Sequence, residues 1–290
     1  MKKVSLVLSG GGARGIAHIG VLEALEKQGY EVHSITGTSM GAVVGGIYAA
    51  GKMKKFKEWI LNLNKKDIFK LVDFTLFNNG FIKGDKIFEE ISTFIQDIQI
   101  QDLPINFSAT ATDLVNKEEV LFTQGSLYNA MRASIAIPNV ITPVKNEGSI
   151  LVDGGVVNNV PINHAQRIDN DLLIAVNVNA DIPHQPKKKK KKEEQQSLYQ
   201  STINKFSQHL SELFSENKNN DLGYFDIMST SFELMRNKMV KFSLRDNPPD
   251  ILIEVSRDSS TIYDFYKADE LIEIGHKATM LSLKNYTDKS

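Results

Sequence analysis

Residues 32–51 read VHSITGTSMGAVVGGIYAAG, and this segment indicates an α/β fold. His33–Thr36 is a short strand candidate, and Ala42–Ala50 is a helix candidate built mostly from small residues. Ser39 lies on the turn between them in a G-x-S-x-G pattern, which is typical of a nucleophile elbow that projects a serine hydroxyl above a sheet. The alternative is a plain glycine-rich turn. The glycines that leave room for an elbow are Gly37 and Gly41.

A second glycine-rich turn, GGGARG at residues 10–15, lies between the strand candidate Val4–Leu8 and the helix candidate Arg14–Gln28. Glycines let the backbone turn sharply and bring N–H groups close to a ligand, and a helix N-terminus adds partial positive charge there. The turn is therefore a candidate anion site, for a phosphate or for a developing oxyanion. Its candidate residues are Gly10, Gly11, Gly12 and Arg14. The Arg14 side chain has three open roles: steadying the loop, attracting an anionic head group, or forming a plain salt bridge.

The same turn matches G-x-G-x-x-G, the fingerprint of dinucleotide-binding folds. That function needs an acidic residue at the end of the second strand to bind the ribose. The second strand candidate ends instead in Gly37-Thr38-Ser39, and Glu31 precedes it and would point the wrong way. A nucleotide-binding module is therefore the weaker interpretation of these glycines.

A third glycine-framed segment, Asp153-Gly154-Gly155, directly follows the apolar run Ile150–Val152. Open α/β sheets bind their ligands at the carboxyl ends of the strands, so an aspartate there is a candidate catalytic residue. Taken alone, an Asp-Gly turn explains Asp153 equally well. Because all three glycine-framed segments follow strand candidates, we expect them to meet at one edge of the sheet.

The remaining segments alternate between strand and helix patterns. This alternation predicts a mostly parallel sheet with helices on both faces. The further helix candidates are Phe56–Leu63, Lys86–Ile95 and Lys267–Leu283, and the further strand candidates are Phe107–Ala111, Val120–Phe122, Leu172–Val178 and Ile251–Val255.

We interpret residues 1–290 as a single catalytic domain with a long insertion at about residues 181–245. Within the insertion, the lysine run Lys187–Lys192 predicts a disordered loop, and a polar helical region follows at about Ser197–Glu216. A final strand and helix at about residues 250–284 are expected to rejoin the core. The alternative is two domains that divide near residue 185.

The formal net charge is −1 and the chain has no cysteine, so no global field attracts nucleic acid and disulfide or thiolate chemistry is excluded. No apolar run approaches the roughly 20 residues of a membrane span. We expect a cytoplasmic protein. Peripheral membrane contact through Lys187–Lys192 is one interpretation of the lysine run, and a solvated loop is the favoured one. Phe74–Phe77 and Phe81–Ile82 are candidate acyl-pocket or interface residues, although core packing explains them as well.

None of the six histidines lies in a glycine-framed or strand-end context, and no metal-binding spacing such as H-E-x-x-H occurs. We therefore predict no metal, no cofactor and no catalytic histidine. In a hydrolase with the order Ser, Asp, His, the candidates would be His164, His184, His209 and His276. His164 is expected on a helix that starts near Pro161 and leads away from the site.

Taken together, these motifs resemble the patatin-like phospholipases. The resemblance rests on GGGARG, GTSMG and DGG in this order, and it covers about residues 4–180. It is reinforced by the block from Arg132-Ala133-Ser134 through Pro138 and Pro143, and by Asn159 and Pro161. The lysine-rich insertion has no counterpart in the family pattern, and the final strand and helix fit it more loosely.

The resemblance implies a three-layer α/β/α fold, a catalytic dyad of Ser39 and Asp153, and an oxyanion hole in the glycine-rich loop. It also implies hydrolysis of lipid acyl esters, as in a phospholipase A or a lysophospholipase, through an acyl-Ser39 intermediate. An acyltransferase would share that intermediate and stays an alternative. A catalytically silent scaffold is disfavoured because every motif residue is intact. The expected partner is a lipid or acyl-ester substrate, and the sequence leaves homo-oligomerisation open.

Overall fold

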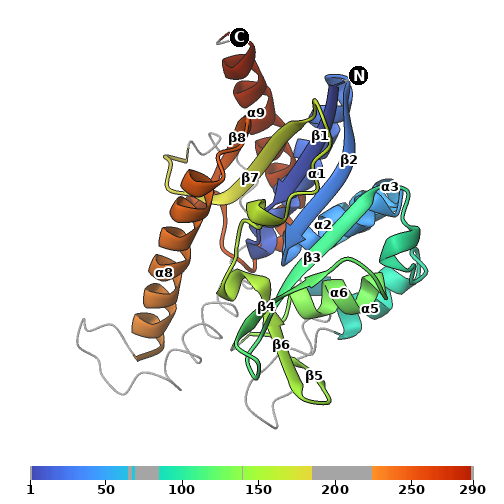
Figure 1. Ribbon diagram of the computed structural model, residues 1–290, viewed down its shortest axis with the longest axis vertical. Coiled ribbons are helices and arrows are strands. Elements are labelled where there is room, and N and C mark those ends of the chain that lie inside the picture. The colour runs from blue at the N-terminus through green and yellow to red at the C-terminus, as the bar shows by residue number, and fades with distance from the viewer. Residues whose placement is uncertain (1, 65–66, 69–84, 139, 185–223, 289–290) are drawn as a thin grey trace, which may run out of the picture. The chain divides into compact units, whose positions relative to one another are not determined.

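The computed structural model describes residues 2–64, 67–68, 85–138, 140–184 and 224–288 (Figure 1). By its contacts the chain divides into two units, one of Met1–His184 with Met239–Ser290 and one of Gln185–Lys238. The first unit contains every strand in the described part of the chain. Four predicted segments lie outside the described residues, namely Lys187–Lys192, Ser197–Glu216, Phe74–Phe77 and Phe81–Ile82.

One sheet of eight strands forms the centre of the first unit, counted over the described residues. The strands are β1 (Lys2–Leu8), β2 (Tyr30–Thr38), β3 (Asn106–Asp113), β4 (Glu118–Phe122), β5 (Val144–Asn146), β6 (Ser149–Asp153), β7 (Leu172–Ala180) and β8 (Ile251–Ser256). Their order is β5-β6-β3-β2-β1-β7-β8, and β4 pairs with β3. The five strands from β3 to β8 run parallel, whereas β4, β5 and β6 form antiparallel pairs. The expectation of a mostly parallel sheet is confirmed.

The described helices are α1 (Ala17–Lys27), α2 (Met40–Ala49), α3 (Met53–Asn62), α5 (Asp85–Ser92), α6 (Leu127–Ser134), α8 (Tyr224–Asp246) and α9 (Ala268–Thr287). Short 3-10 helices are η1 (Gly12–Ile16), η2 (Ile100–Asp102), η3 (Gly154–Val156), η4 (Ile162–His164), η5 (Arg257–Ser259) and η6 (Phe265–Lys267). The helix expected from Arg14 is thus a 3-10 turn followed by α1. The helix expected after Pro161 is only the short η4, and α6 and α8 were not predicted as helices.

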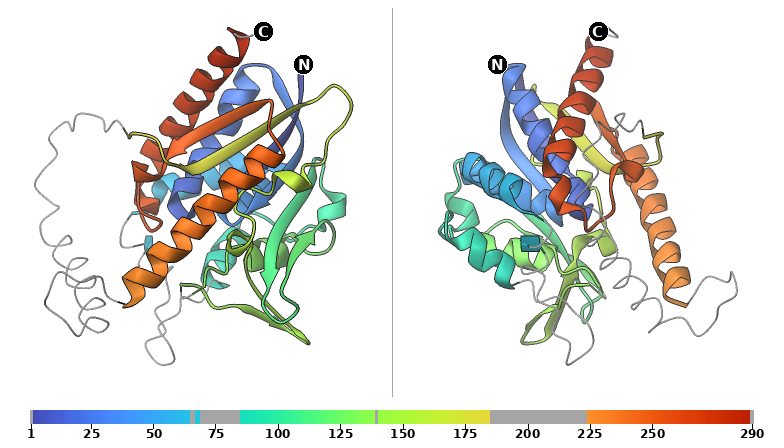
Figure 2. Two further views of the ribbon diagram at one scale, coloured as in Figure 1. Left: turned by 60° about the vertical axis from the view of Figure 1, so that its left-hand side comes forward. Right: turned by 180° about the vertical axis from the view of Figure 1, so that it is seen from behind.

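Alternation along β1 shows how the sheet is covered on both faces. Val4, Leu6 and Leu8 pack in the larger hydrophobic core with residues of α1, α2 and α9, whereas Val7 packs in a second core with Val240 of α8. Successive strand residues point to opposite faces, so these two cores lie on the two sides of the sheet. The structure therefore has the three α/β/α layers that were expected (Figure 2).

The end of the chain rejoins the core through β8 and α9. β8 pairs in parallel with β7, and α9 packs along α1. Two glycines make this helix contact very close, because a methyl group on Gly20 would meet the carbonyl of Ile272 and one on Gly275 would meet the carbonyl of Ala17. Both helices therefore depend on the absence of side chains where their backbones meet.

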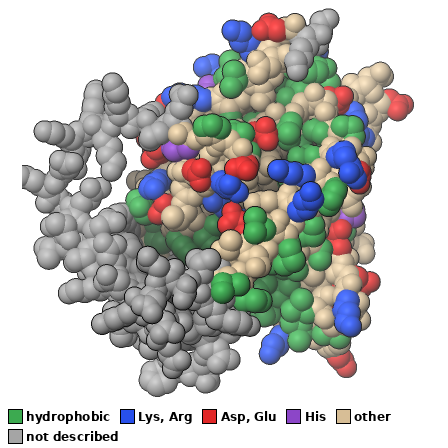
Figure 3. All heavy atoms as spheres, turned by 90° about the vertical axis from the view of Figure 1, so that its left-hand side faces the viewer, with side chains coloured by type: hydrophobic (Ala, Val, Ile, Leu, Met, Phe, Trp, Pro, Cys, Tyr) green, Lys and Arg blue, Asp and Glu red, His purple; other side chains and the backbone are tan. Residues whose placement is uncertain are grey.

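The surface carries charges of both signs. Figure 3 shows lysine, arginine, aspartate and glutamate side chains intermingled on one face, without a large patch of one sign among the described residues. Within the described part of the chain, no helix combines the length and the apolar character that crossing a membrane requires.

Candidate active site

Ser39 lies at the junction of β2 and α2 in a strained backbone conformation. Its φ is 54° and its ψ is −125°, which is uncommon for a residue with a side chain. Gly37 and Gly41 are required by space: a methyl group on Gly37 would lie 2.6 Å from the backbone N of Ala42, and one on Gly41 would collide with the carbonyl of Leu8. The predicted turn thus has the geometry of a nucleophile elbow.

Two further contacts hold the elbow. The backbone N–H of Ser39 donates to Oγ of the buried Ser134 at the end of α6, with an N–O distance of 2.8 Å. The carbonyl of Ser39 accepts from Ala42 N (2.9 Å) and from Val43 N (3.1 Å) at the start of α2. Ser39 is thus the N-cap residue of α2. The partial positive charge at the N-terminus of this helix favours negative charge on the Ser39 oxygen.

Asp153 reaches the same edge of the sheet in a way that the sequence did not predict. It was expected at the carboxyl end of a parallel strand, but β6 is antiparallel to β3, with Asp153 opposite Ala111. β3 continues beyond the end of β2, where Thr110 pairs with Thr38, and β6 returns along this extension. The Asp153 side chain is buried, and its Oδ1 accepts the N–H of Gly155 at 2.7 Å.

The side-chain amide of Asn159 lies between two of the three glycine-framed segments, and the third lies beside one of them. A methyl group built on Gly10 would lie 2.7 Å from Asn159 Oδ1 and 3.0 Å from the Cβ of Ser39. One built on Gly155 would lie 2.8 Å from the same Asn159 oxygen and 3.0 Å from Asp153 Oδ1. The elbow, the N-terminal loop and the DGG turn therefore lie close together, as expected, although β6 brings the DGG turn there as an antiparallel strand.

The N-terminal loop has two N–H groups that are engaged and two that are not. The N–H of Gly10 donates to the carbonyl of Asn159 (3.1 Å), and that of Ala13 donates to the carbonyl of Ile262 (3.0 Å). Within the described part of the chain, no hydrogen bond involves the N–H of Gly11 or of Gly12. The structure thus differs from the expectation for Gly10, whose N–H is already used, and leaves Gly11 and Gly12 as the available donors.

Arg14 also differs from its expected place among the oxyanion donors. Its buried guanidinium donates to the carbonyl of Arg257 (2.9 Å), to that of Ser260 (3.4 Å) and to Oδ1 of Asn179 (2.8 Å). These contacts join the loop to β7 and to the segment after β8. Of the roles considered for Arg14, this geometry matches the steadying of the loop.

His18 supports the N-terminal loop through a hydrogen bond to the backbone of Ser9. Its Nε2 lies 2.9 Å from the backbone carbonyl of Ser9, which can only accept, so this nitrogen carries the proton. Burial lowers the pKa of His18 to about 4, and the hydrogen bond to Ser9 only partly opposes this effect. The ring is therefore neutral at pH 7 and serves as a donor to the backbone at the end of β1.

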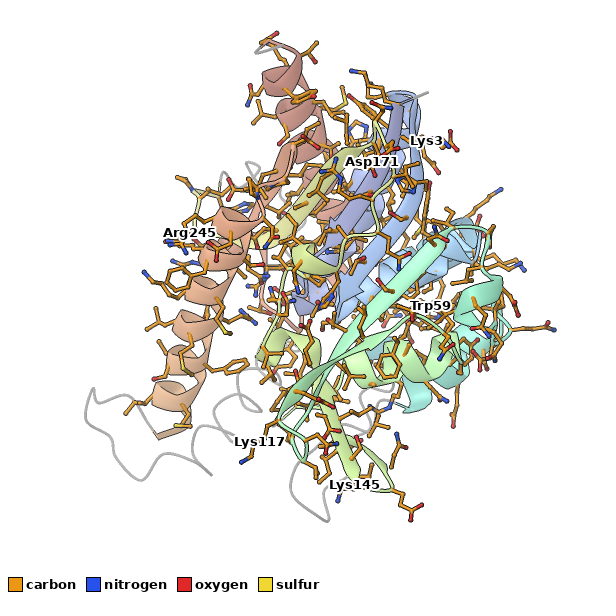
Figure 4. The ribbon with its side chains drawn as sticks, in the orientation of Figure 1. Lys3, Trp59, Lys117, Lys145, Asp171 and Arg245 are labelled. Carbon is orange, nitrogen blue, oxygen red and sulfur yellow. The ribbon has the colours of Figure 1, made fainter. Side chains whose placement is uncertain are left out.

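Two other histidines have contacts away from this loop. His33 Nε2 lies 2.9 Å from Oδ2 of the buried Asp171, at the amino end of the strands (Figure 4). His164 Nε2 lies 3.0 Å from Glu119 Oε2. The described residues contain no group of three or more histidine, aspartate and glutamate side chains placed to hold a metal ion. Glu31 pairs with Lys3 near the amino end of β2, so it lies far along the strand from the GGGARG turn.

Comparison with known proteins identifies the family. The family model for patatin-like phospholipases matches residues 6–165, which is more than half of the chain. The chain therefore belongs to the patatin-like phospholipase family.

Relatives cover the chain to different extents. An uncharacterised NTE family protein of Mycobacterium tuberculosis is 29% identical over 98% of this chain and 92% of its own length. The lysophospholipase NTE1 of Candida glabrata is 27% identical over 94% of this chain, and that of Aspergillus fumigatus is 33% identical over 64%. The chain spans only 15% and 12% of these two fungal proteins. Among solved structures, VipD from Legionella pneumophila shares the fold, with a TM-score of 0.50, 15% identity, and coverage of 98% of this chain and 67% of that chain.

Three residues at the site were not assigned roles from the sequence. Asn159 and Ser134 were noted only as part of the family resemblance, and Asn179 was not noted. The available signal for Asn179 was the alternation Asn177-Val178-Asn179 at the carboxyl end of an apolar strand, because polar side chains at that end often face a ligand.

Proposed function

We propose that this protein is a serine hydrolase of lipid acyl esters, similar to a phospholipase A or a lysophospholipase, in which Ser39 is the nucleophile and Asp153 its base. The proposal rests on the chain's membership of the patatin-like phospholipase family and on the names of its lysophospholipase relatives. The observation that carries the residue assignment is the proximity of the strained Ser39 elbow, the DGG turn with the buried Asp153, and the N-terminal loop in which the N–H groups of Gly11 and Gly12 are unengaged.

The reaction follows from these groups. Asp153 accepts the Ser39 proton while the hydroxyl oxygen attacks the ester carbonyl. The carbonyl oxygen becomes an oxyanion, which the N–H groups of Gly11 and Gly12 stabilise together with the N-terminus of α2. The C–O bond of the ester then breaks, and the leaving alcohol takes the proton from Asp153. A water molecule, deprotonated by Asp153, then attacks the acyl group on Ser39. The bond between the acyl carbon and Ser39 Oγ breaks, Oγ takes the proton back from Asp153, and the fatty acid is released.

A fluorophosphonate probe tests the nucleophile directly. We expect stoichiometric labelling of the wild type at Ser39, as located by peptide mass spectrometry, and no labelling of Ser39→Ala. Ser92→Ala is the control, because Ser92 is exposed and its Oγ donates to the carbonyl of Glu89 on α5. Labelling at another serine, or release of fatty acid by a folded Ser39→Ala variant at the wild-type rate, would exclude the proposal.

A separate measurement distinguishes a hydrolase from an acyltransferase, because both pass through the acyl-enzyme. Product analysis in the presence of glycerol decides between them, with a lysophospholipid as the acyl donor. A hydrolase releases mainly free fatty acid at millimolar glycerol, whereas predominant formation of a glycerol ester would assign transfer to the alcohol. Cytoplasmic location and peripheral membrane contact stay predictions from the sequence.

A further inference from the structure

The carbonyl of Gly10 is held by two side-chain amides. Asn179 Nδ2, at the end of β7, donates to this oxygen at 2.6 Å, and Asn159 Nδ2 donates to it at 3.3 Å. Both asparagines are buried, with exposed fractions of 5% and 4%. Two side-chain donors on one backbone carbonyl fix the orientation of the peptide group to which it belongs.

That peptide group also contains the N–H of Gly11. In a trans peptide, the N–H points opposite to the C=O across the same plane. The amides of Asn159 and Asn179 therefore hold the Gly10 carbonyl pointing towards themselves, and the Gly11 N–H points in the opposite direction. Within the described residues, no hydrogen bond involves this N–H. It is therefore available to donate to the oxyanion that forms in the proposed reaction.

The orientation of the Asn179 amide is itself determined. The oxygen and nitrogen of an asparagine side chain are told apart by their partners. Arg14 can only donate, and its Nη2 lies 2.8 Å from Oδ1 of Asn179, so the NH₂ group must face the Gly10 carbonyl. Arg14 is held in turn by the carbonyls of Arg257 and Ser260.

We infer that Asn179, oriented by Arg14, and Asn159 are positioning residues that aim the Gly11 N–H at the oxyanion. This inference deepens the proposed function and rests on it. In this role, the asparagines act through the Gly10–Gly11 peptide group, whose carbonyl they hold.

Asn179→Asp tests the inference with the least change of shape. The aspartate keeps the contact with Arg14 but presents only acceptor oxygens to the Gly10 carbonyl, which repels them. Removing an oxyanion donor costs about 10²–10³-fold in kcat, so misdirecting one should cost about 10–100-fold. KM should stay within about twofold, because the oxyanion exists only in the transition state.

The inhibition constant (Ki) of a transition-state mimic separates positioning of the Gly11 N–H from a purely structural role of Asn179. A trifluoromethyl ketone with a fatty acyl chain forms an oxyanion on the serine, whereas a neutral fatty alcohol of the same chain length does not. In Asn179→Asp, the Ki of the ketone should rise by the same factor as kcat falls, and the Ki of the alcohol should not change. Asn158→Ala is the control, because the Asn158 amide binds Glu119 and Asn163 rather than the loop.

If Asn179→Asp does not fold, Asn159→Ser and Asn179→Ser are measured in the same way, since each removes one amide donor from the Gly10 carbonyl and leaves a smaller side chain. Wild-type kcat and ketone Ki in folded Asn179 and Asn159 variants would overturn the inference while the proposed function stands. Equal weakening of the ketone and of the fatty alcohol would also overturn it, because the loss would then be one of general structure. Absence of esterase activity and of fluorophosphonate labelling in the wild type would instead refute the proposed function, and the inference with it.

Discussion

Gly12 is the loop residue at which an added methyl group has the clearest expected consequence. Its φ is +56°, in the left-handed region, and a Cβ at this position would lie 2.7 Å from the carbonyl oxygen of Ile262 and 2.8 Å from the Cβ of Ile262. Gly12→Ala therefore adds both a backbone cost and an overlap with a neighbouring segment. Both act directly on one of the two N–H groups proposed to bind the oxyanion.

The size of the effect follows from these distances. Non-bonded carbon atoms prefer about 3.5–4.0 Å, so the loop or Ile262 must move by about 1 Å. A misplacement of about 1 Å at a reacting centre costs about 10²-fold in rate, which is the expected loss in kcat. An alanine in the left-handed region costs about 1–2 kcal/mol of folding free energy, and the overlap adds to this cost.

Gly51→Ala separates the two effects. Gly51 follows α2 with a φ of +68°, and nothing lies within 4 Å of the Cβ that it would gain. Urea unfolding should show a loss of about 1–2 kcal/mol, and ester hydrolysis should show an unchanged kcat. Gly12→Ala should lose at least as much stability and about 10²-fold in kcat.

The kinetic pattern of Gly12→Ala distinguishes oxyanion binding by the loop from two other roles. A wild-type kcat together with the stability loss seen in Gly51→Ala would show that the loop does not bind the oxyanion. A change in KM alone would make the loop a substrate-binding element, because the oxyanion is absent from the ground state.

Asp153→Asn should lower kcat by at least about 10²-fold, because an amide cannot accept the Ser39 proton. Steady-state kinetics checks this beside His164→Gln, whose kcat should stay within a few-fold of the wild-type value. An equal loss of kcat in the histidine variant would replace the dyad by a triad. Burial raises the pKa of Asp171, but hydrogen bonds donated by Ser5, Ile168 and neighbouring groups outweigh it and lower the pKa to about 2. Because the folded-state pKa lies below the usual 3.8, the Asp171 carboxylate stabilises the fold above pH 4, and this stabilisation is lost as the pH falls towards 2. Asp171→Asn should therefore lower the free energy of unfolding by about 2 kcal/mol at pH 7. In urea titrations, the difference in unfolding free energy from the wild type should shrink below pH 4, and a pH-independent difference would disprove the linkage. Gly275→Val should force α9 away from α1 and lower the Tm by several degrees, whereas an unchanged melting curve would contradict the close helix contact.

The three glycine-framed motifs could be located from the sequence because local chemistry specifies them. The elbow needs small residues on both sides of Ser39, and GTSMG supplies them. Strand ends in a parallel sheet converge at one edge, so the meeting of the GGGARG and GTSMG turns followed from pattern alone. The family match at residues 6–165 covers the same motifs.

The direction of β6 could not be predicted, because pairing direction depends on tertiary contacts rather than on the apolar pattern of Ile150–Val152. The short α6 was missed for a related reason. It spans only Leu127–Ser134, too few residues for a periodic pattern to stand out, and its role at the elbow depends on the contact between Ser134 and Ser39.

Long sequence separations hid the support of the glycine-rich loop. The two amides on the Gly10 carbonyl come from residues 149 and 169 positions away. Arg14 contacts residues more than 240 positions away, beyond β8. The side chain of Arg14 was expected beside the anion because it follows the loop in sequence, but the fold turns it towards Asn179 and the carbonyls of the final segment.

In the proposed reaction, hydrolysis proceeds through an ester on Ser39. Rapid acid quench of the wild type during turnover of a p-nitrophenyl fatty acyl ester, followed by mass spectrometry of the peptides, tests it most directly. We expect the peptide containing Ser39 to gain the mass of the acyl group, the adduct to form with the burst of nitrophenol, and Ser39→Ala to show neither. Sustained turnover with the acyl group on another residue would exclude Ser39 as the nucleophile.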